Sequence, residues 1–502
     1  MDLDPKNTDD LSNIMQTVMD KLRHKIIPGT IMVNPDFRVY KLKLNQMMDI
    51  WSIQMFCPVI NVIRNYSSGI AKISKEFYEL NQQPYFIPVT YTSETNLEFN
   101  KTLPNVTECL TQSTSELEIP NLNENEWIIA NIQQSGYYRV NYDSENWRKI
   151  ARYLNSENYT NIHVINRAQI IDDAFHFAMQ GKLSFSIFWD LTSYLPRKET
   201  NYVAWYPMIK IFYNIMQILP FSYAPRNLPY TALKEILFQI KSLFEEMKLY
   251  KDDQSLLFFE ERDEQQNYLN LILSKLGCII QDFLCLKMAE VQLELHLINK
   301  KIIMPGWYEW TYCNGLRRAN DTLWGQAWKE ATNKYLAKSD YTMFEYLTCI
   351  EHPQILLHYL KSALPKFEKD LFLNSENNET LQVIQNQQRK IKTKIFFSTL
   401  ATHAKNNNML KEILSNFNDI KFSHINSTAA FIVLINNAYF KDQIDQIFKY
   451  AKINMPQLFS YIANKTVKRS TQIEEQLTFF VNLIEKANQK WYGKVNSNSS
   501  IA

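Results

Sequence analysis

The feature that most constrains the fold is a change in the spacing of apolar residues between residues 127 and 154. Before this stretch, apolar and polar residues alternate in short runs, as is typical of β-strands. After it, apolar residues recur at roughly every third or fourth position, as on the buried face of a helix. Four earlier runs are strand candidates: residues 59–64, 70–77, 85–92 and 113–119. The chain is therefore expected to pass from a small antiparallel β-sandwich into a long helical array.

The stretch also predicts how these two parts are joined. Residues 127–132 and 137–142 alternate as strands do, and the turn between them ends at Gly136, which is expected to take a positive φ. A β-hairpin is thus expected to lead into the first helix, with Asp143 or Ser144 as its N-cap. Helical spacing then predicts two buried faces, Trp147, Ile150, Ala151 and Leu154 on the first helix and Ile165, Ala168, Ile171 and Phe175 on the second.

Spacing and composition divide the 502 residues into four parts. Residues 1–54 have helical spacing but are short for a domain, residues 55–142 form the sandwich, residues 143–492 form the helical domain, and residues 493–502 are a polar tail. No constant repeat length runs through the helical part, which indicates an irregular superhelix, either a solenoid or a bowl. The expected fold class is multidomain and mainly α.

Composition argues against several classes of function. The 54 basic and 52 acidic residues give a net charge of +2, so nothing favours a nucleic-acid partner. The chain has 9 glycines and no G-x-G-x-x-G or Walker-type loop, which argues against a nucleotide site. No apolar run reaches the roughly 18 residues that a transmembrane helix needs. The polar start, MDLDPKNTDDL, does not resemble a signal peptide, so the chain as printed is expected to lack an export address.

Cysteines and glycosylation sequons indicate the opposite environment. The six cysteines allow a disulfide framework, although six buried thiols are an equally open interpretation. Asn-x-Ser/Thr sequons, some of which arise by chance in a chain rich in asparagine, occur at Asn65, Asn100, Asn105, Asn158, Asn320, Asn378, Asn426, Asn464 and Asn498. Both features are typical of secreted or cell-surface proteins.

A set of motifs follows in order along residues 45–365. It includes GYYRVNYD at 136–143 with Asn-Trp three residues later, INRAQIIDDAFHFAMQGKL at 165–183, and Glu-x-x-Tyr-x-x-Trp from Glu199. This set resembles the sandwich and the endoplasmic-reticulum-aminopeptidase-like C-terminal helical domain of gluzincin aminopeptidases of the aminopeptidase N type. The signature positions, which the resemblance implies are structural, are Trp127, Asn131, Gly136, Tyr137, Tyr138, Arg139, Asn141, Tyr142, Asp143, Trp147, Asn166, Arg167, Asp172, Asp173, Tyr202 and Trp205.

The resemblance also implies two disulfides. By analogy with the family, Cys313 would pair with Cys349, and Cys278 with Cys285. Geometry speaks against the second pair, because cysteines seven residues apart on one continuous helix lie about 10 Å apart along its axis. A disulfide needs Cα atoms within about 7 Å, and no Gly or Pro between these cysteines signals a loop. Cys57 and Cys109 are either a third pair or two free thiols.

The residues that the family uses for catalysis are missing from the printed sequence. Such enzymes remove N-terminal residues from peptides with a zinc-activated water, which requires His-Glu-x-x-His on a helix and a further glutamate. None of the eight histidines is followed by glutamate, and no two stand four residues apart. We therefore expect no catalytic residue, no metal ligand and no bound cofactor on this chain, although the full-length family carries zinc.

The first functional hypothesis is that the chain is the non-catalytic C-terminal region of an aminopeptidase N-like protein. Residues 1–54 would then be the last helices of a catalytic domain. In the family the helical bowl encloses the peptide and supports domain or dimer contacts, so the expected partners are a peptide, the catalytic region or a second copy. The alternative is a stand-alone α-solenoid that binds a peptide or a protein, and a third is that another chain supplies the catalytic half. The resemblance implies an extracellular or cell-surface location.

Overall fold

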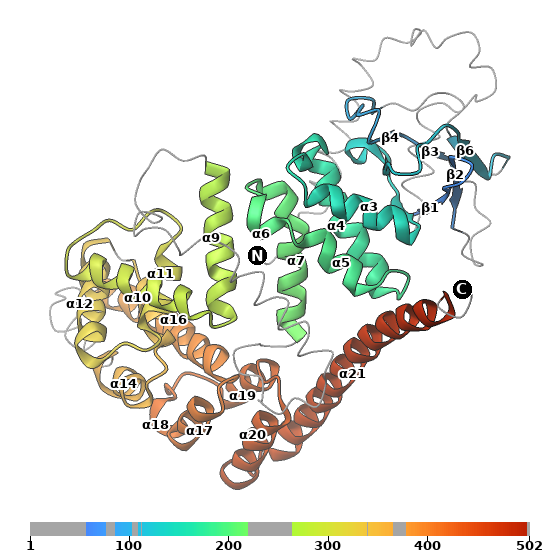
Figure 1. Cartoon of the computed structure of the whole chain (residues 1–502). Helices are drawn as coiled ribbons and strands as arrows, with labels where there is room; N and C mark the ends of the chain where they lie inside the picture. Colours follow the sequence, from blue (N-terminus) through green and yellow to red (C-terminus); the bar gives the residue numbers. More distant parts are fainter. Residues whose placement is uncertain are drawn as a thin grey trace, which may run out of the picture.

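The computed structural model describes residues 57–76, 86–102, 109–111, 113–218, 264–338, 340–364 and 378–498 (Figure 1). The expected helical segment 1–54 and the last residues of the polar tail lie outside these ranges. In the described part, a small β region precedes a large helical region, and the expected fold class is confirmed.

Eight strands occupy the described chain up to Tyr142. The main sheet has the order β6-β2-β1-β8, and two two-stranded sheets pair β3 with β5 and β4 with β7. The strands are β1 (Val59–Asn65), β2 (Ile70–Lys75), β3 (Phe86–Pro88), β4 (Tyr91–Ser93), β5 (Cys109–Thr111), β6 (Glu116–Ile119), β7 (Ile128–Ala130) and β8 (Arg139–Tyr142). Val59, Ile60, Val62, Ala71 and Ile73 are buried. The alternating runs therefore correctly marked where strands form.

The prediction that β7 and β8 pair as a β-hairpin is wrong. β7 pairs with β4, whereas β8 pairs with β1 in parallel, with Val59 opposite Arg139 and Val62 opposite Tyr142. A short 3-10 helix, η3 (Ile132–Gln134), separates the two strands. Gln133 and Gln134 both have positive φ there, at 50° and 51°, so the chain turns out of one sheet and into another.

Gly136 is required for a different reason from the one expected. It is not among the described glycines with positive φ, which are Gly69, Gly181 and Gly306. A Cβ atom at residue 136 would instead overlap the ring of Tyr138, which is buried. Glycine is therefore required at this position because the tyrosine ring leaves no room for a Cβ atom beside the backbone of the turn.

Helices follow from Ser144 onward. They are α3 (Ser144–Leu154), α4 (Val164–Met179), α5 (Phe185–Thr192), α6 (Leu195–Lys198), α7 (Tyr202–Ile218), α9 (Glu264–Ile279), α10 (Phe283–Leu297), α11 (Tyr308–Leu316), α12 (Asp321–Lys338), α13 (Thr342–Tyr346), α14 (Pro353–His358), α16 (Asn378–His403), α17 (Asn407–Ser415), α18 (Phe417–Ile420), α19 (Ser427–Asn436), α20 (Lys441–Asn454) and α21 (Phe459–Asn498). Within the described ranges, no single helix is long and apolar enough to span a membrane. The consecutive helices α9 and α10 reach that length and apolarity only when they are counted together, and the chain bends by 113° between them.

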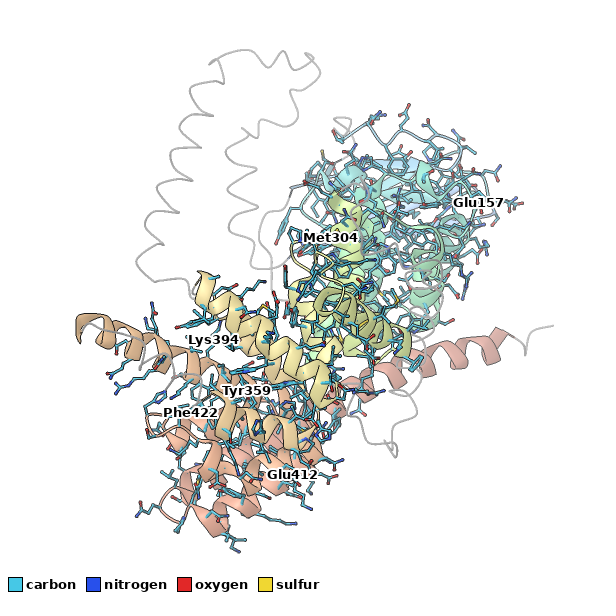
Figure 2. The ribbon with its side chains drawn as sticks, turned by 90° about the vertical axis from the view of Figure 1, so that its left-hand side faces the viewer. Glu157, Met304, Tyr359, Lys394, Glu412 and Phe422 are labelled. Carbon is cyan, nitrogen blue, oxygen red and sulfur yellow. A yellow bond between two sulfur atoms is a disulfide. The ribbon has the colours of Figure 1, made fainter. Side chains whose placement is uncertain are left out.

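Two large apolar cores, together with a small one around Cys278 and Cys285, organise the described elements. The first joins the strands to α3–α9, and the second runs through the helices from α10 to α21. In Figure 2, Glu157 lies with the N-terminal helices, and Tyr359 and Glu412 lie with the C-terminal ones. Leu477 of α21 packs against both cores, and α21 contacts α4, α5 and α7 as well as α19 and α20. The last helix therefore returns to the first ones, so that the superhelix closes on itself (Figure 1).

Candidate functional site

The signature residues meet at the junction between the sheets and α4. Two buried asparagines fold the turn before β8. The Asn131 Nδ2 donates to the carbonyl oxygens of Gly136 (3.0 Å) and Tyr138 (2.9 Å), and its Oδ1 accepts from the Gly136 amide (2.9 Å). Asn166 Nδ2 donates to the Asn131 carbonyl (2.9 Å), and its Oδ1 accepts from the Gln133 amide (2.8 Å). These bonds hold the strained turn on α4.

An ion-pair cluster attaches β8 to the same helix. Nη1 of Arg139 lies 2.8 Å from Asp172 Oδ2 and 2.7 Å from Asp173 Oδ1. The Val140 amide donates to the other Asp173 oxygen at 3.0 Å. Burial raises the pKa of Asp173 to about 6, even though the Arg139 cation and the Val140 amide both lower it. Asp173 thus accepts from both the backbone and a side chain of β8.

A pocket of ≈ 360 Å³ opens beside this cluster. Its lining includes Cys57, the turn residues Gln134 and Gly136, Tyr137 and Arg139. Tyr137 is 48% exposed. Arg139 already faces two aspartates, and burial raises the pKa of Cys57, which favours the unreactive thiol over the thiolate. The cysteine of this pocket is therefore not activated as a nucleophile.

The first helix is fixed to the sheets by its N-cap. Asp143 accepts from the amides of Glu145 (3.0 Å) and Asn146 (2.9 Å), as the expected capping residue should. Its carboxylate also accepts from the hydroxyl of Tyr66 at 2.8 Å. The side chain of Asn146 bonds to both the amide and the carbonyl of Ile128, at 3.0 and 2.9 Å. The start of the helix is therefore also linked to β7 and to the turn that follows β1.

Aromatic signature residues pack beneath this cap. Tyr142 and Trp147 meet edge to face with centroids 4.8 Å apart, and the Tyr142 hydroxyl accepts from the Ala130 amide at 3.0 Å. Trp147 Nε1 donates to Asn141 Oδ1 at 3.3 Å. Trp127 is fully buried. These contacts assign the aromatic signature to packing rather than to a ligand cage.

A second buried ion pair lies farther along the helices. Arg167 on α4 binds Glu199 with Nε–Oε2 and Nη2–Oε1 distances of 2.8 and 3.4 Å, and the two side chains are 7% and 2% exposed. Nη1 of Arg167 donates to the Ile162 carbonyl at 2.6 Å. Trp205 Nε1 donates to the Glu199 carbonyl at 3.0 Å, and Tyr202 contacts Tyr268. The E-x-x-Y-x-x-W motif thus ties α7 to α4.

The structure contains both disulfides that the resemblance implied, with Cα–Cα distances of 5.3 Å for Cys278–Cys285 and 5.1 Å for Cys313–Cys349. The geometric argument against the first pair is wrong because the helix breaks between its cysteines. Gln281 takes a positive φ of 57°, and Asp282 caps α10 by accepting from the Cys285 amide at 2.8 Å. The capping aspartate was the signal that sequence reasoning missed. Neither Cys57 nor Cys109 forms a disulfide.

Most of the sequons within the described ranges are at the surface. The exposed ones are Asn65, Asn100, Asn158, Asn320, Asn426 and Asn464. Asn105 lies outside the described residues, as do the side chains of Asn378 and Asn498. The exposed asparagines could each accept a glycan without disturbing a core.

No cluster in the described part of the chain brings together three or more His, Cys, Asp or Glu side chains that could hold a metal ion. The signature residues instead form two structural ion pairs, a turn and a helix cap. The junction has the geometry of a rigid connection between the β region and the helical region.

A small β region followed by a large helical region is the fold class expected for the C-terminal region of an aminopeptidase of the aminopeptidase N type. The family model described as "ERAP1-like C-terminal domain" matches residues 127–417, so this chain belongs to that family.

Relatives named aminopeptidase N align with much of this chain. The protein from Plutella xylostella is 29% identical over 333 residues, which are 64% of this chain and 32% of that relative. The rabbit protein (Oryctolagus cuniculus) is also 29% identical, over 64% of this chain and 33% of its own length. The human protein is 26% identical over 366 residues, or 68% and 34% of the two chains. The alignments thus span about a third of the length of these relatives.

Proposed function

We propose that this chain is the non-catalytic C-terminal region of an aminopeptidase N-like protein, which encloses peptide and supports contacts with a catalytic region or a second copy. The observation that carries the proposal is the family match over residues 127–417, in a sequence without His-Glu-x-x-His. The contacts of α21 with α4, α5 and α7 support an enclosing role, because they make the helical array a closed frame.

The purified chain is expected to bind substoichiometric zinc and to show no turnover of aminoacyl chromogenic substrates. Zinc would be measured by plasma mass spectrometry after addition of the metal and gel filtration. Fluorescent peptides, followed by anisotropy, should bind without loss of their N-terminal residue. Stoichiometric zinc with steady turnover would contradict the non-catalytic assignment, and failure to bind any peptide of a random pool would contradict the enclosing role.

We also propose an extracellular or cell-surface location. Six exposed sequons and two disulfides support it, and two relatives carry the name membrane alanyl aminopeptidase. Protein isolated from its source should run faster on gels after enzymatic removal of N-glycans. The control is the same protein with Asn65, Asn158 and Asn320 changed to Gln, whose shift should be smaller. An unchanged mobility of the native protein would contradict this location.

A further inference from the structure

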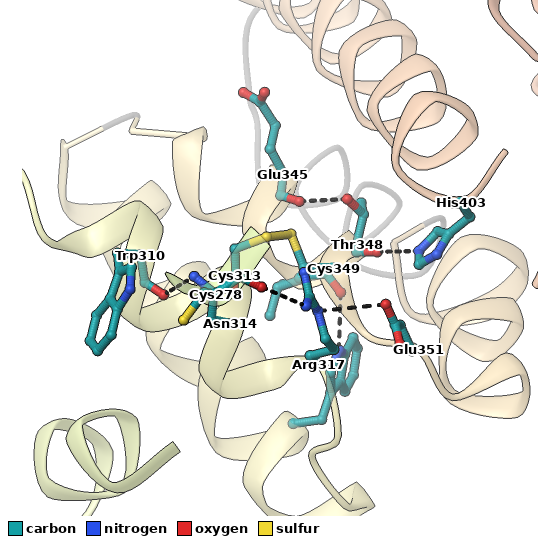
Figure 3. The surroundings of a disulfide bond; sticks show 12 residues. Cys278, Trp310, Cys313, Asn314, Arg317, Glu345, Thr348, Cys349, Glu351 and His403 are labelled. Atoms are coloured by element: carbon teal, nitrogen blue, oxygen red, sulfur yellow. Dashed lines mark hydrogen bonds and ion pairs between the residues drawn. A yellow bond between two sulfur atoms is a disulfide. The ribbon is translucent and has the colours of Figure 1, made fainter. Parts of the chain in front are cut away.

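A fully buried histidine, His403, connects two segments of the second core that are far apart in the sequence. His403 ends α16, and its Nε2 lies 2.7 Å from the carbonyl oxygen of Thr348 in η8 (Leu347–Cys349), as Figure 3 shows. Thr348 precedes Cys349, which is bonded to Cys313 of α11. The histidine therefore connects α16 to a segment that a disulfide holds on α11, across 55 residues of sequence.

The hydrogen bond fixes where the histidine carries its proton. A carbonyl oxygen can only accept, so the Nε2 must carry the hydrogen, and the neutral ring keeps a lone pair on Nδ1. Nδ1 is buried and has no hydrogen-bond partner among the described residues. Protonation would place a charge on this atom without an acceptor to stabilise it.

The charges around the ring make such protonation more costly. The positive charges of Arg317, at the end of α11, and of Lys405, just beyond α16, disfavour a second positive charge on the ring, whereas the carboxylate of Glu351 favours it. Glu351 lies 3.5 Å from Arg317, with which it is paired (Figure 3). Glu345, whose carbonyl accepts from the Thr348 hydroxyl, is already paired with Lys394 at 2.6 Å. Burial lowers the pKa of His403 to about 4, although the Thr348 carbonyl and Glu351 raise it.

The same junction extends to the later helices. Gln443 of α20 donates to the carbonyl of Lys405 at 2.6 Å and accepts from the amides of Tyr439 and Phe440. Phe440 belongs to the first core, and so the backbone beyond His403 is linked to α20 and to the N-terminal helices. Loosening at η8 and the end of α16 would thus be transmitted to the closure of the superhelix.

We propose that His403 is a proton-sensitive latch that holds α16 on the disulfide-linked η8 segment at neutral pH and loosens this junction in an acidic compartment. The second core itself does not unfold, because apolar residues on both sides of the junction, among them Phe344, Leu347, Ile395 and Leu400, still belong to one cluster. The latch would make the closure of the bowl weaker in acidic vesicles than at the cell surface. It concerns the helical frame itself and does not depend on the proposed function.

The sign and size of the effect follow from proton linkage. In the open state the ring has an ordinary pKa of 6.5, and in the closed state a pKa of about 4, so the open state binds the proton more tightly. The stability of the closed junction is therefore fully present above pH 6.5 and is lost as the pH falls towards 4. By this linkage the opening constant rises about 30-fold between pH 7.5 and pH 5.

Hydrogen exchange of the full chain, with its disulfides intact, tests the proposal. After correction for the intrinsic pH dependence of exchange, peptides covering residues 345–349 and 395–405 should open about 30-fold more often at pH 5 than at pH 7.5. His403→Gln keeps a donor for the Thr348 carbonyl but cannot titrate, so its peptides should show little change. His358→Gln, at an exposed position on α14, is the matched control and should behave like the wild type. Equal pH responses of wild type and His403→Gln would overturn the proposal.

A second measurement applies even where His403→Gln does not fold. Nuclear magnetic resonance of the wild type with labelled histidine should show His403 neutral at pH 5, with a proton on Nε2. The resonance is assigned by its contact with Thr348, which does not require the variant. Titration of this ring near pH 6.5 in the folded protein would overturn the proposal.

Discussion

Replacing Glu199 by Ala is expected to lower the free energy of unfolding by about 3–5 kcal/mol, because the change leaves the buried guanidinium of Arg167 without its carboxylate. The Arg167 side chain is 7% exposed, so water cannot easily take over the role of the glutamate. The carboxylate also accepts from the Asn201 amide at 3.0 Å, which begins the turn into α7. Urea denaturation followed by circular dichroism measures the loss.

Two further variants separate the contribution of the unpaired charge to this loss of stability from the contribution of side-chain packing. Glu199→Gln keeps the size and one acceptor but removes the charge, and it should lose a smaller part of the stability. The double variant Arg167→Met with Glu199→Leu removes both charges and should recover most of the loss, because apolar side chains of similar volume often replace a buried pair without cost. A double variant as unstable as Glu199→Ala would show that packing and the bond to the Ile162 carbonyl, rather than the unpaired charge, cause the effect.

Local sequence signals predicted where strands and helices begin better than they predicted which strands pair. Alternation placed the start of β1 at Val59, and Asp143 caps α3 as expected. The partner of β8 could not be read in this way, because it lies about 80 residues earlier, at Val59–Val62. Alternation reports which face of a strand is buried, but it carries no information about the neighbouring strand.

The buried face of α4 shows a second limit. Spacing predicted Ile165, Ala168, Ile171 and Phe175, but Ile171 alone of these four is fully buried. The buried face of α4 also includes the polar residues Asn166, Arg167 and Asp173. Polar residues can occupy such a face because β8, η3 and Glu199 supply hydrogen bonds and charge. These partners come from distant segments, so apolar periodicity cannot reveal them.

The residues of the junction were predicted from their motifs, whereas His403 was not. The signature positions include Asn131, Arg139 and Asp173, which meet at one place, because motif residues that fit together are visible as a pattern. A histidine between Thr402 and Ala404 carries no such pattern. Its burial depends on the docking of η8, which lies 55 residues away.

Removal of the Cys313–Cys349 disulfide by changing both cysteines to Ala is expected to cost about 4 kcal/mol of unfolding free energy. A disulfide restricts the unfolded chain, and its effect grows with the length of the loop that it closes. These cysteines are 36 residues apart, whereas Cys278 and Cys285 are 7 apart. The same relation gives about 2.5 kcal/mol for the shorter loop, so the second double variant is the matched control.

Both variants replace partly or fully buried sulfur by the same smaller side chain, so the comparison largely cancels the packing loss. In guanidinium denaturation, the variant without Cys313–Cys349, which closes the longer loop, should therefore unfold at a lower midpoint than the variant without Cys278–Cys285. Cys313–Cys349 also holds η8 against α11, beside the contact between Thr348 and His403. Its removal should additionally speed hydrogen exchange of residues 345–349 at neutral pH. Equal destabilisation of both variants would mean that native contacts around the sulfurs, not restriction of the unfolded chain, determine how much each disulfide contributes.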